Sequence, residues 1–523
     1  MYTPLRVMPL RSLLGGFGLL LLAFACDDDA KVIDTGTAAE QPAPSGSGGS
    51  QGSTGSTDPA VPSNNTGNSG STGASPDSPT GSAEGMGGSN GLSNEGPGNG
   101  MMTPPPLPPP EGGEVSISGE ITEDTTWTAD KIYVLDGTSP VFVVGNHTLT
   151  IEPGTTIKGQ GLGTALVVTR GSRLIANGTV DRPIVFTSGV TPGLRNPGDW
   201  GGLVLLGGAP INAAAGSIEG IGAADTRAAY GGPAPNEGDP THDCGSLQYV
   251  RVEFAGFQYV VDQELNGLTL GGCGTQTVID HVQVHKGLDD GIEVFGGTVD
   301  IKHAVITNSA DDGLDWDRGW TGRGQFIIVR TDPTASDGAI EADNRDGNNA
   351  AAPRSNPTLY NLTLVGDGGS LASPGVVLRR GTYASIHNSI VMGFPVSGLD
   401  IRDAESITGA TGEGLTLTNS LFFDNGSDGT VHADVANDGT TVPDALDEGP
   451  WLAERANQLG VDPGIADAYL QATPNFVPPA ASPASTGALA TPTSDFFEPA
   501  PYIGALPPGG SDWTAGWTSY PAR

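Results

Sequence analysis

An internal repeat of 22 residues constrains the fold of this chain more than any other feature. The segment HVQVHKGLDDGIEV, which starts at His281, aligns with HAVITNSADDGLDW, which starts at His303. In both copies a turn with Asp and Gly precedes an apolar–polar–apolar run, the alternation expected of a short strand. A propeller blade needs about 40 residues, and a leucine-rich repeat needs a Leu and Asn pattern that is missing here. The repeat therefore predicts an all-β chain that winds as a parallel β-helix, a solenoid with one coil per repeat.

Short strands of the same kind continue through residues 114–523, which we assign to a single β-helix domain with a C-terminal cap. Frequent turns separate them, as is typical of an all-β chain. Long helical periodicity is missing from the sequence, apart from a candidate short helix at 451–459. Trp513 and Trp517 are expected to cap the open end of the solenoid, where unpaired backbone groups would otherwise be exposed.

The first residues have the features of an export signal. Arg6 and Arg11 precede an apolar run of 12 residues at 13–24, which is too short to span a bilayer as a mature helix. A small residue and then Cys26 follow the run, an arrangement that resembles the bacterial lipoprotein signal. The resemblance implies a signal peptide over residues 1–25 and a lipid on Cys26 that anchors the chain in the cell envelope, at the outer membrane or the cell surface. A plain secretory signal is the alternative.

Residues 26–113 consist mainly of Gly, Ser, Thr, Pro and Asn. Such a segment buries too little apolar surface to offset the entropy of ordering, so we expect a disordered linker between the anchor and the domain.

The charge of the chain limits the kinds of partner that it can bind. The chain has 23 Lys and Arg and 59 Asp and Glu, which gives a formal net charge of −36. Binding to nucleic acid needs clustered cationic side chains, so the sequence argues against a nucleic-acid partner. A polyanionic ligand would need a bridging cation.

Several segments resemble right-handed parallel β-helix proteins of the pectin-lyase-like superfamily. These segments are TIEPGTTIKG (150–159), LIANGTVDRPIVFTS (174–188) and TPNFVPPAASPASTGA (473–488). Further segments resemble a family of exported bacterial β-helix proteins of uncharacterised function: GDWGGLVLLGGAPIN (198–212), NGLTLGG (266–272), DDGIEVFGG (289–297) and DWTAGWT (512–518). The resemblance implies the fold but not the activity, because β-helices include lyases, hydrolases, adhesins and passive rods.

Stacked coils bring acids that are distant in the sequence onto one outer face. The first outward position after the turn glycine carries, coil by coil, Thr269, Glu293, Asp315, Val377 and Asp400. The second carries Phe295, Asp317, Arg379 and Arg402, and a coil with one extra residue, a β-bulge, adds Glu341 and Asp343. We call the five acids of this face the acidic ladder: Glu293, Asp315, Asp317, Glu341 and Asp343.

Carboxylates stacked about 5 Å apart repel one another, so a pKa must rise or a cation must lie between them. Clustered carboxylate oxygens suit Ca²⁺, which makes the acidic ladder a candidate calcium site. In the lyases of the superfamily, Ca²⁺ on such a face bridges a uronate while an arginine takes a proton, and the resemblance places Arg379, Arg380 or Arg402 in that role. Trp316 and Trp320 are close in sequence and are candidate ligand-binding side chains. The alternative interpretation is that the acids are solvated and the arginines pair with them.

Two cysteines remain besides Cys26. Cys244 and Cys273 are 29 residues apart, about one coil with a loop, so neighbouring coils can bring them within bonding distance. An exported chain meets oxidising conditions, which favours a disulfide over two free buried thiols.

Two functions are consistent with these features. The first is a lipid-anchored surface protein that is not catalytic and that binds glycans or mediates adhesion. The second is a Ca²⁺-dependent polysaccharide lyase or a related carbohydrate-active enzyme. A groove with an arginine pointing into it would favour the lyase, whereas arginines engaged in ion pairs would favour binding.

Overall fold

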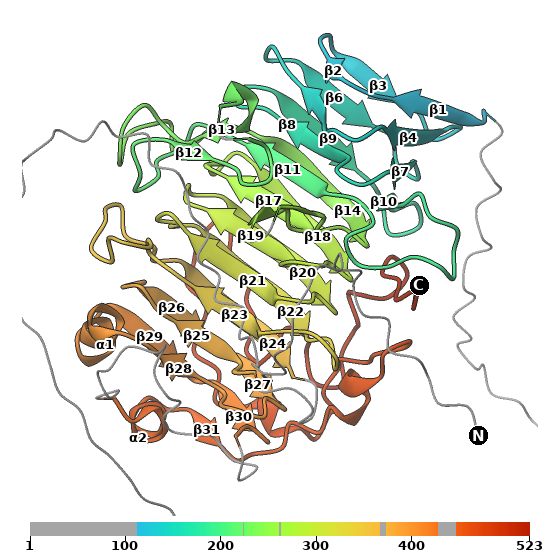
Figure 1. Cartoon of the computed structure of the whole chain (residues 1–523). Helices are drawn as coiled ribbons and strands as arrows, with labels where there is room; N and C mark the ends of the chain where they lie inside the picture. Colours follow the sequence, from blue (N-terminus) through green and yellow to red (C-terminus); the bar gives the residue numbers. More distant parts are fainter. Residues whose placement is uncertain (1–111, 223, 261–262, 367–372, 427–445) are drawn as a thin grey trace, which may run out of the picture. The chain divides into compact units, whose positions relative to one another are not determined.

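The computed structural model describes residues 112–222, 224–260, 263–366, 373–426 and 446–523. Most of them wind into successive coils, from the blue N-terminal strands to the orange C-terminal ones in Figure 1. Two long sheets, A with 17 strands and B with 10, run along the coils, and the pairings within both are parallel. The expected all-β parallel β-helix is confirmed.

The strands of sheet A are β1 (Glu114–Ile117), β3 (Thr125–Trp127), β4 (Ile132–Asp136), β6 (Thr148–Ile151), β7 (Thr156–Gln160), β9 (Arg173–Asn177), β10 (Ile184–Ser188), β14 (Gly245–Glu253), β18 (Val278–His285), β20 (Asp300–Thr307), β22 (Arg323–Arg330), β24 (Thr358–Val365), β26 (Ala384–His387), β27 (Ile390–Met392), β29 (Leu415–Thr418), β30 (Leu421–Phe423) and β31 (Gln458–Leu459).

The strands of sheet B are β2 (Glu120–Ile121), β5 (Val141–Val143), β8 (Ala165–Val168), β11 (Gly202–Leu206), β17 (Leu268–Gly271), β19 (Ile292–Phe295), β21 (Asp312–Asp317), β23 (Gly338–Ala342), β25 (Val376–Leu378) and β28 (Asp400–Ile401). Two small antiparallel pairs are β12 (Gly216–Ser217) with β13 (Ala229–Tyr230), and β15 (Gln258–Val260) with β16 (Gln263–Glu264). The helices are α1 (Ala404–Thr411) and α2 (Glu448–Ala453), with 3₁₀ turns η1 (Thr226–Ala228), η2 (Ala466–Tyr469) and η3 (Pro483–Ser485).

Strand pairing follows the repeat seen in the sequence. Val278 of β18 pairs with Asp300 of β20, and Ile292 of β19 pairs with Leu314 of β21, a step of 22 residues in both sheets. The inward apolar side chains of both sheets form one continuous core. Each coil therefore buries its inner face against the next, as the solenoid prediction requires.

The long strands of sheet A bend at one residue with left-handed backbone. Tyr249, His281, His303 and Phe326 occupy this position in successive coils, with φ of 48°, 57°, 50° and 59°. Their rings stack, with centroids 4.3, 4.3 and 5.0 Å apart from one coil to the next. A non-glycine residue pays about 1–3 kcal/mol for such a backbone, and the stacking offsets part of that cost.

The C-terminal tail, residues 461–523, packs along the outer face of sheet A. Its apolar side chains cover outward residues such as Val305 and Ile328. The Trp517 ring meets His281 at 5.7 Å between centroids, and Trp513 meets His303 at 4.9 Å. The expectation that the two tryptophans cap the open end is therefore wrong. They cover the middle of the stack, because the outer face of sheet A is apolar there and would otherwise be exposed to water.

The candidate helix at 451–459 corresponds to α2, which begins and ends earlier, at Glu448 and Ala453. Trp451 and Leu452 of this helix belong to the core of the coil. The indole N–H of Trp451 donates to the carbonyl of Ala410 at 2.9 Å, which joins α2 to α1.

The disulfide prediction is confirmed. Cys244 and Cys273 are bonded, with their Cα atoms 5.8 Å apart, and both are fully buried.

The predicted signal peptide, Cys26 and the linker up to residue 111 lie outside the described residues. Within the described ranges, no helix combines the length and the apolar character that a membrane crossing requires.

Candidate functional site

The outer face of sheet B changes character along the coils. In the early coils it is apolar and covered by the insertion 207–244, whose Tyr230 and Ile211 pack with Val204 and other outward residues. This cover reaches Phe295, whose ring lies 5.7 Å from the Tyr230 ring. The acidic ladder begins beside Phe295 and continues over β21 and β23.

The predicted stacking of outward residues is confirmed by the strand register. In successive coils Thr269 pairs with Glu293, Glu293 with Asp315, Asp315 with Glu341, Glu341 with Val377, and Val377 with Asp400. The predicted β-bulge before Glu341 is wrong, because β21 and β23 pair in a constant register from Asp312 with Gly338 to Trp316 with Ala342.

Glu293, Asp315 and Glu341 of this series line a cleft over sheet B. Ten carboxylates and two guanidinium groups line it, together with Phe295: Glu219, Glu264, Asp289, Asp290, Glu293, Asp315, Asp317, Glu341, Asp343, Asp346, Arg379 and Arg380. Its internal volume is about 40 Å³. That space holds about three water molecules or a small hydrated cation.

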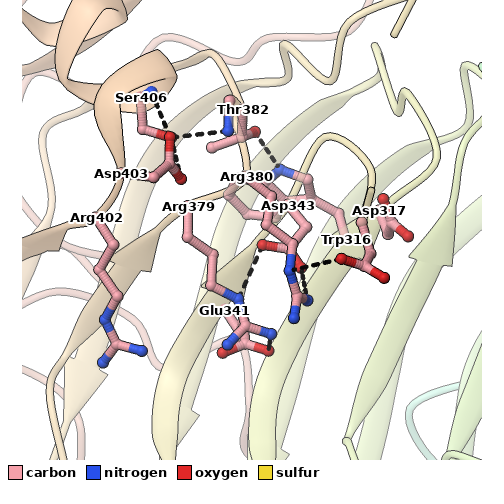
Figure 2. A network of polar contacts seen from close by, with 12 residues as sticks. Trp316, Asp317, Glu341, Asp343, Arg379, Arg380, Thr382, Arg402, Asp403 and Ser406 are labelled. Atoms are coloured by element: carbon pink, nitrogen blue, oxygen red, sulfur yellow. Dashed lines mark hydrogen bonds and ion pairs between the residues drawn. The ribbon is translucent and has the colours of Figure 1, made fainter. Parts of the chain in front are cut away.

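Two acids of the ladder are neutralised by arginines at the end of β25. Arg379 forms ion pairs with Glu341 and, at 3.0 Å, with Asp343, and Arg380 reaches Asp343 at 2.6 Å (Figure 2). Arg379 is 9% exposed, Asp343 5%. Burial opposes the charge of Arg379, but Asp343 and Glu341 outweigh it and raise the pKa of its guanidinium.

Helix α1 holds the turn that carries these arginines. Asp403 accepts hydrogen bonds from the backbone N–H groups of Glu405 and Ser406, at 3.0 and 2.9 Å, and so caps the helix. The hydroxyl of Ser406 in turn accepts from the backbone N–H of Gly381 at 2.9 Å (Figure 2). The guanidinium groups are therefore fixed by an element that follows them in the chain.

A second group of acids is clustered without a guanidinium. Carboxylate oxygens of Asp290, Glu293 and Asp315 lie within 4.8 Å of one another. Asn266 donates to Glu293 at 2.5 Å, whereas Oδ1 of Asp315 is buried and has no hydrogen-bond partner in the described part of the chain. Burial and the neighbouring carboxylates raise the pKa values of Asp290 and Asp315 well above the usual range.

The remaining predicted residues of this face are paired locally. Asp317 lies 3.2 Å from Arg318, yet burial raises its pKa to about 6. Arg402 lies 2.9 Å from Asp400, and Arg402 does not line the cleft among the described residues. Arg379, Arg380 and Arg402, the three candidates for proton abstraction, therefore all have carboxylate partners.

Trp316 and Trp320 do not serve the cleft, so their prediction as ligand-binding side chains is wrong. Both are 0% exposed and belong to the core of the coil. Their indole N–H groups donate to Thr382 at 3.1 Å and to the carbonyl of Val299 at 2.9 Å. Trp316 alternates with outward Asp315 and Asp317, so its position in the strand turns it inward.

The sequence interpretation missed several acids of the cleft. The repeat places Asp289 and Asp290 in the turn before the strand, and Glu219 and Glu264 come from insertions outside the repeat. Asp290 does have a structural role, because its Oδ1 accepts the backbone N–H of Asp312 at 2.9 Å. The one signal available was the recurrence of Asp-Asp-Gly directly before the ladder position.

Fold and cleft together define a parallel β-helix protein with an acidic site on one sheet. The family model of the pectate-lyase-like β-helix domain matches residues 119–456. The chain therefore belongs to the pectate-lyase-like β-helix family. Neither a curated protein nor a solved structure matches it.

Proposed function

We propose that this chain is a lipid-anchored protein of the cell envelope that binds a polysaccharide across the mouth of the cleft over sheet B and does not cleave it. The membership in a pectate-lyase-like family supports a carbohydrate ligand. The export features and the segment 26–113 support presentation at a distance from a membrane through Cys26.

The ion pairs of Arg379 and Arg380 are the observation that favours binding over catalysis. A lyase needs a base that removes a proton, and a guanidinium must lose its own proton first. Arg379 is held by two carboxylates, which raise its pKa, and Arg380 is held by one of them. We therefore interpret both guanidinium groups as cations that stabilise the neighbouring carboxylates, not as bases.

We further propose that the cleft takes a divalent cation, and Ca²⁺ fits best. The donors are Asp290, Glu293 and Asp315, three carboxylates whose oxygens lie within 4.8 Å. Such hard oxygen ligands are those that Ca²⁺ prefers. The buried, unpartnered Oδ1 of Asp315 supports this assignment. The cation would also lower the repulsion between this cleft and an acidic polysaccharide.

Affinity electrophoresis of the full chain tests binding. We expect polygalacturonate in the gel to retard the wild type with CaCl₂ and not with EDTA. Asp315→Asn should lose most of the retardation, whereas Glu237→Gln, an exposed acid outside the cleft, should keep it. Equal retardation of both variants, or none of the wild type across acidic and neutral polysaccharides, would refute the proposal.

The lyase remains the second candidate because the arginines lie beside the acids in the cleft. It requires that ultraviolet absorbance from unsaturated products rise when the chain meets polygalacturonate and Ca²⁺. The rise must disappear in Arg379→Lys, whereas the variant Arg227→Lys, at a partly exposed ion-paired arginine outside the cleft, must retain it. We expect no rise.

Anchoring is tested separately. Cys26→Ala should move the chain from the membrane fraction to the soluble fraction. A membrane-bound variant would contradict lipid attachment at this cysteine.

A further inference from the structure

A second cavity lies where strands β18, β20 and β22 of sheet A end, against the C-terminal tail. Its volume is about 280 Å³. Three successive coils and two parts of the tail line it: His285, Lys286, Asn308, Asp332, Pro333, Thr334, Gln471, Ala472, Tyr520 and Ala522. None of these residues lines the acidic cleft.

Lys286 gives this cavity its chemistry. Its side chain is half-buried, and its ammonium group makes no hydrogen bond or ion pair with any residue that the structure describes. Its backbone is fixed, because its N–H donates to the carbonyl of Thr307 at 2.9 Å. Burial lowers the pKa of Lys286, and Arg330 and Arg523 lower it further while Asp332 opposes them.

The surrounding charge favours an anion. Arg330 is 1% exposed and donates to the carbonyl of Leu470 at 2.9 Å and to Asn308, so no carboxylate neutralises it by direct contact within the described ranges. His285 is buried against the carbonyl of Pro521, and burial lowers its pKa to about 3, so it is neutral. The lining itself has one cation, Lys286, and one acid, Asp332. The buried Arg330 behind the lining is close enough to act on Lys286 and adds a second positive charge, in a chain whose net charge is −36.

The walls argue for an organic ligand with hydroxyl groups. Pro333, Ala472 and the Tyr520 ring supply apolar surface, which an inorganic ion would not use. The Thr334 hydroxyl and the exposed Gln471 amide offer polar contacts at the rim. The volume is slightly below that of pockets for drug-sized ligands, so it suits a molecule the size of one sugar unit.

We propose that this cavity binds a small hydroxylated carboxylate, a sugar acid, with its carboxylate on Lys286 and its ring against Tyr520. The site is independent of the cleft over sheet B. Coils and tail both contribute to it, so a ligand there would also hold the tail on sheet A.

Calorimetric titration of the full chain with D-glucuronate in EDTA tests the proposal. We expect saturable binding that weakens at least tenfold for D-glucose, which lacks the carboxylate. Lys286→Gln should weaken binding at least tenfold, and Lys286→Arg should stay within about threefold of the wild type. Lys131→Gln, a lysine outside the cavity, is the matched control and should bind as the wild type does.

Three results would overturn the proposal: no binding of D-glucuronate, binding within twofold of the wild type in Lys286→Gln, or displacement of D-glucuronate by an equal concentration of inorganic phosphate. The last result would identify a plain anion site. Thermal unfolding of each variant checks that it is folded, and Lys286→Arg keeps the test valid if Lys286→Gln is not. Asp315→Asn should bind D-glucuronate normally, so failure here is distinct from failure of the cleft.

Discussion

Single residues in the acidic cleft differ in how their charge is balanced, and this difference decides what each can do. Glu341 and Asp343 have guanidinium partners, whereas Asp290, Glu293 and Asp315 share a cluster of carboxylates. A partnered carboxylate stabilises the fold in its ionised form. A clustered one is stable only with a proton or a cation between it and its neighbours.

Asp315→Asn should stabilise the protein at neutral pH when divalent cations are removed. The pKa of Asp315 is raised in the folded state, so the folded state holds protons that the unfolded state has released. Its contribution to stability is present below the unfolded pKa and is lost as pH rises through the folded one. Asn cannot ionise, so the melting temperature of the variant should exceed that of the wild type by about 2 °C or more near neutral pH.

Calorimetry in EDTA across the acid to neutral range provides the measurement. The gain should shrink towards about pH 4, where both proteins carry no charge at this position. Glu237→Gln should track the wild type throughout. A variant that melts below the wild type at neutral pH would show that the Asp315 carboxylate has a cationic partner.

Arg379→Gln should be strongly destabilising, by about 3–5 kcal/mol, because it removes the guanidinium that pairs with the buried carboxylates of Glu341 and Asp343 and leaves Asp343 with Arg380 alone. The loss should be smaller in acid, where Glu341 and Asp343 can take protons. Denaturant unfolding at two pH values measures both effects. Arg227→Gln, which breaks ion pairs at partly exposed side chains, should cost much less, about 1 kcal/mol. Similar costs for the two variants would contradict the structural role of Arg379.

Among the elements, those built from the repeat could be predicted and those outside it could not. The register of β19, β21 and β23 follows from a fixed step along the chain, so the stacking of Glu293 and Asp315 was available from the sequence. Trp316 follows the same alternation and should have been assigned to the core. The insertion 207–244 and the tail have no repeat, so nothing in the sequence shows which sheet face they cover.

The structure describes no strand beyond β31 at Gln458–Leu459, so side-chain packing holds most of the tail, together with isolated backbone hydrogen bonds such as that from the N–H of Gly504 to the carbonyl of Asn388 at 2.7 Å. Trp517 is fully buried against sheet A, and removal of a buried tryptophan costs about 3–5 kcal/mol. We expect Trp517→Ala to release the tail locally before the coil unfolds. Limited proteolysis should then cut the tail of the variant first and leave a resistant core.

Trp513→Ala is the matched comparison. Because Trp513 is only partly buried, we expect the tail of Trp513→Ala to resist proteolysis better than the tail of Trp517→Ala. Cutting within the coil at the same rate as within the tail would show instead that tail and coil unfold as one unit.

For the molecule as a whole, excess negative charge and a specific cation site make different predictions. A net charge of −36 opposes the compact state through repulsion, and any salt reduces this repulsion by screening. A site formed by Asp290, Glu293 and Asp315 binds a divalent cation in the folded state only, which adds stability that grows with the cation concentration.

We expect NaCl to raise the melting temperature of the wild type modestly, and CaCl₂ at the same ionic strength to raise it by several degrees more. In Asp315→Asn the effect of NaCl should remain while the additional effect of CaCl₂ disappears, and Glu237→Gln should keep both. If the additional effect of CaCl₂ persists in Asp315→Asn, the cation binds elsewhere on the acidic surface and the clustered carboxylates of sheet B are kept neutral by protons.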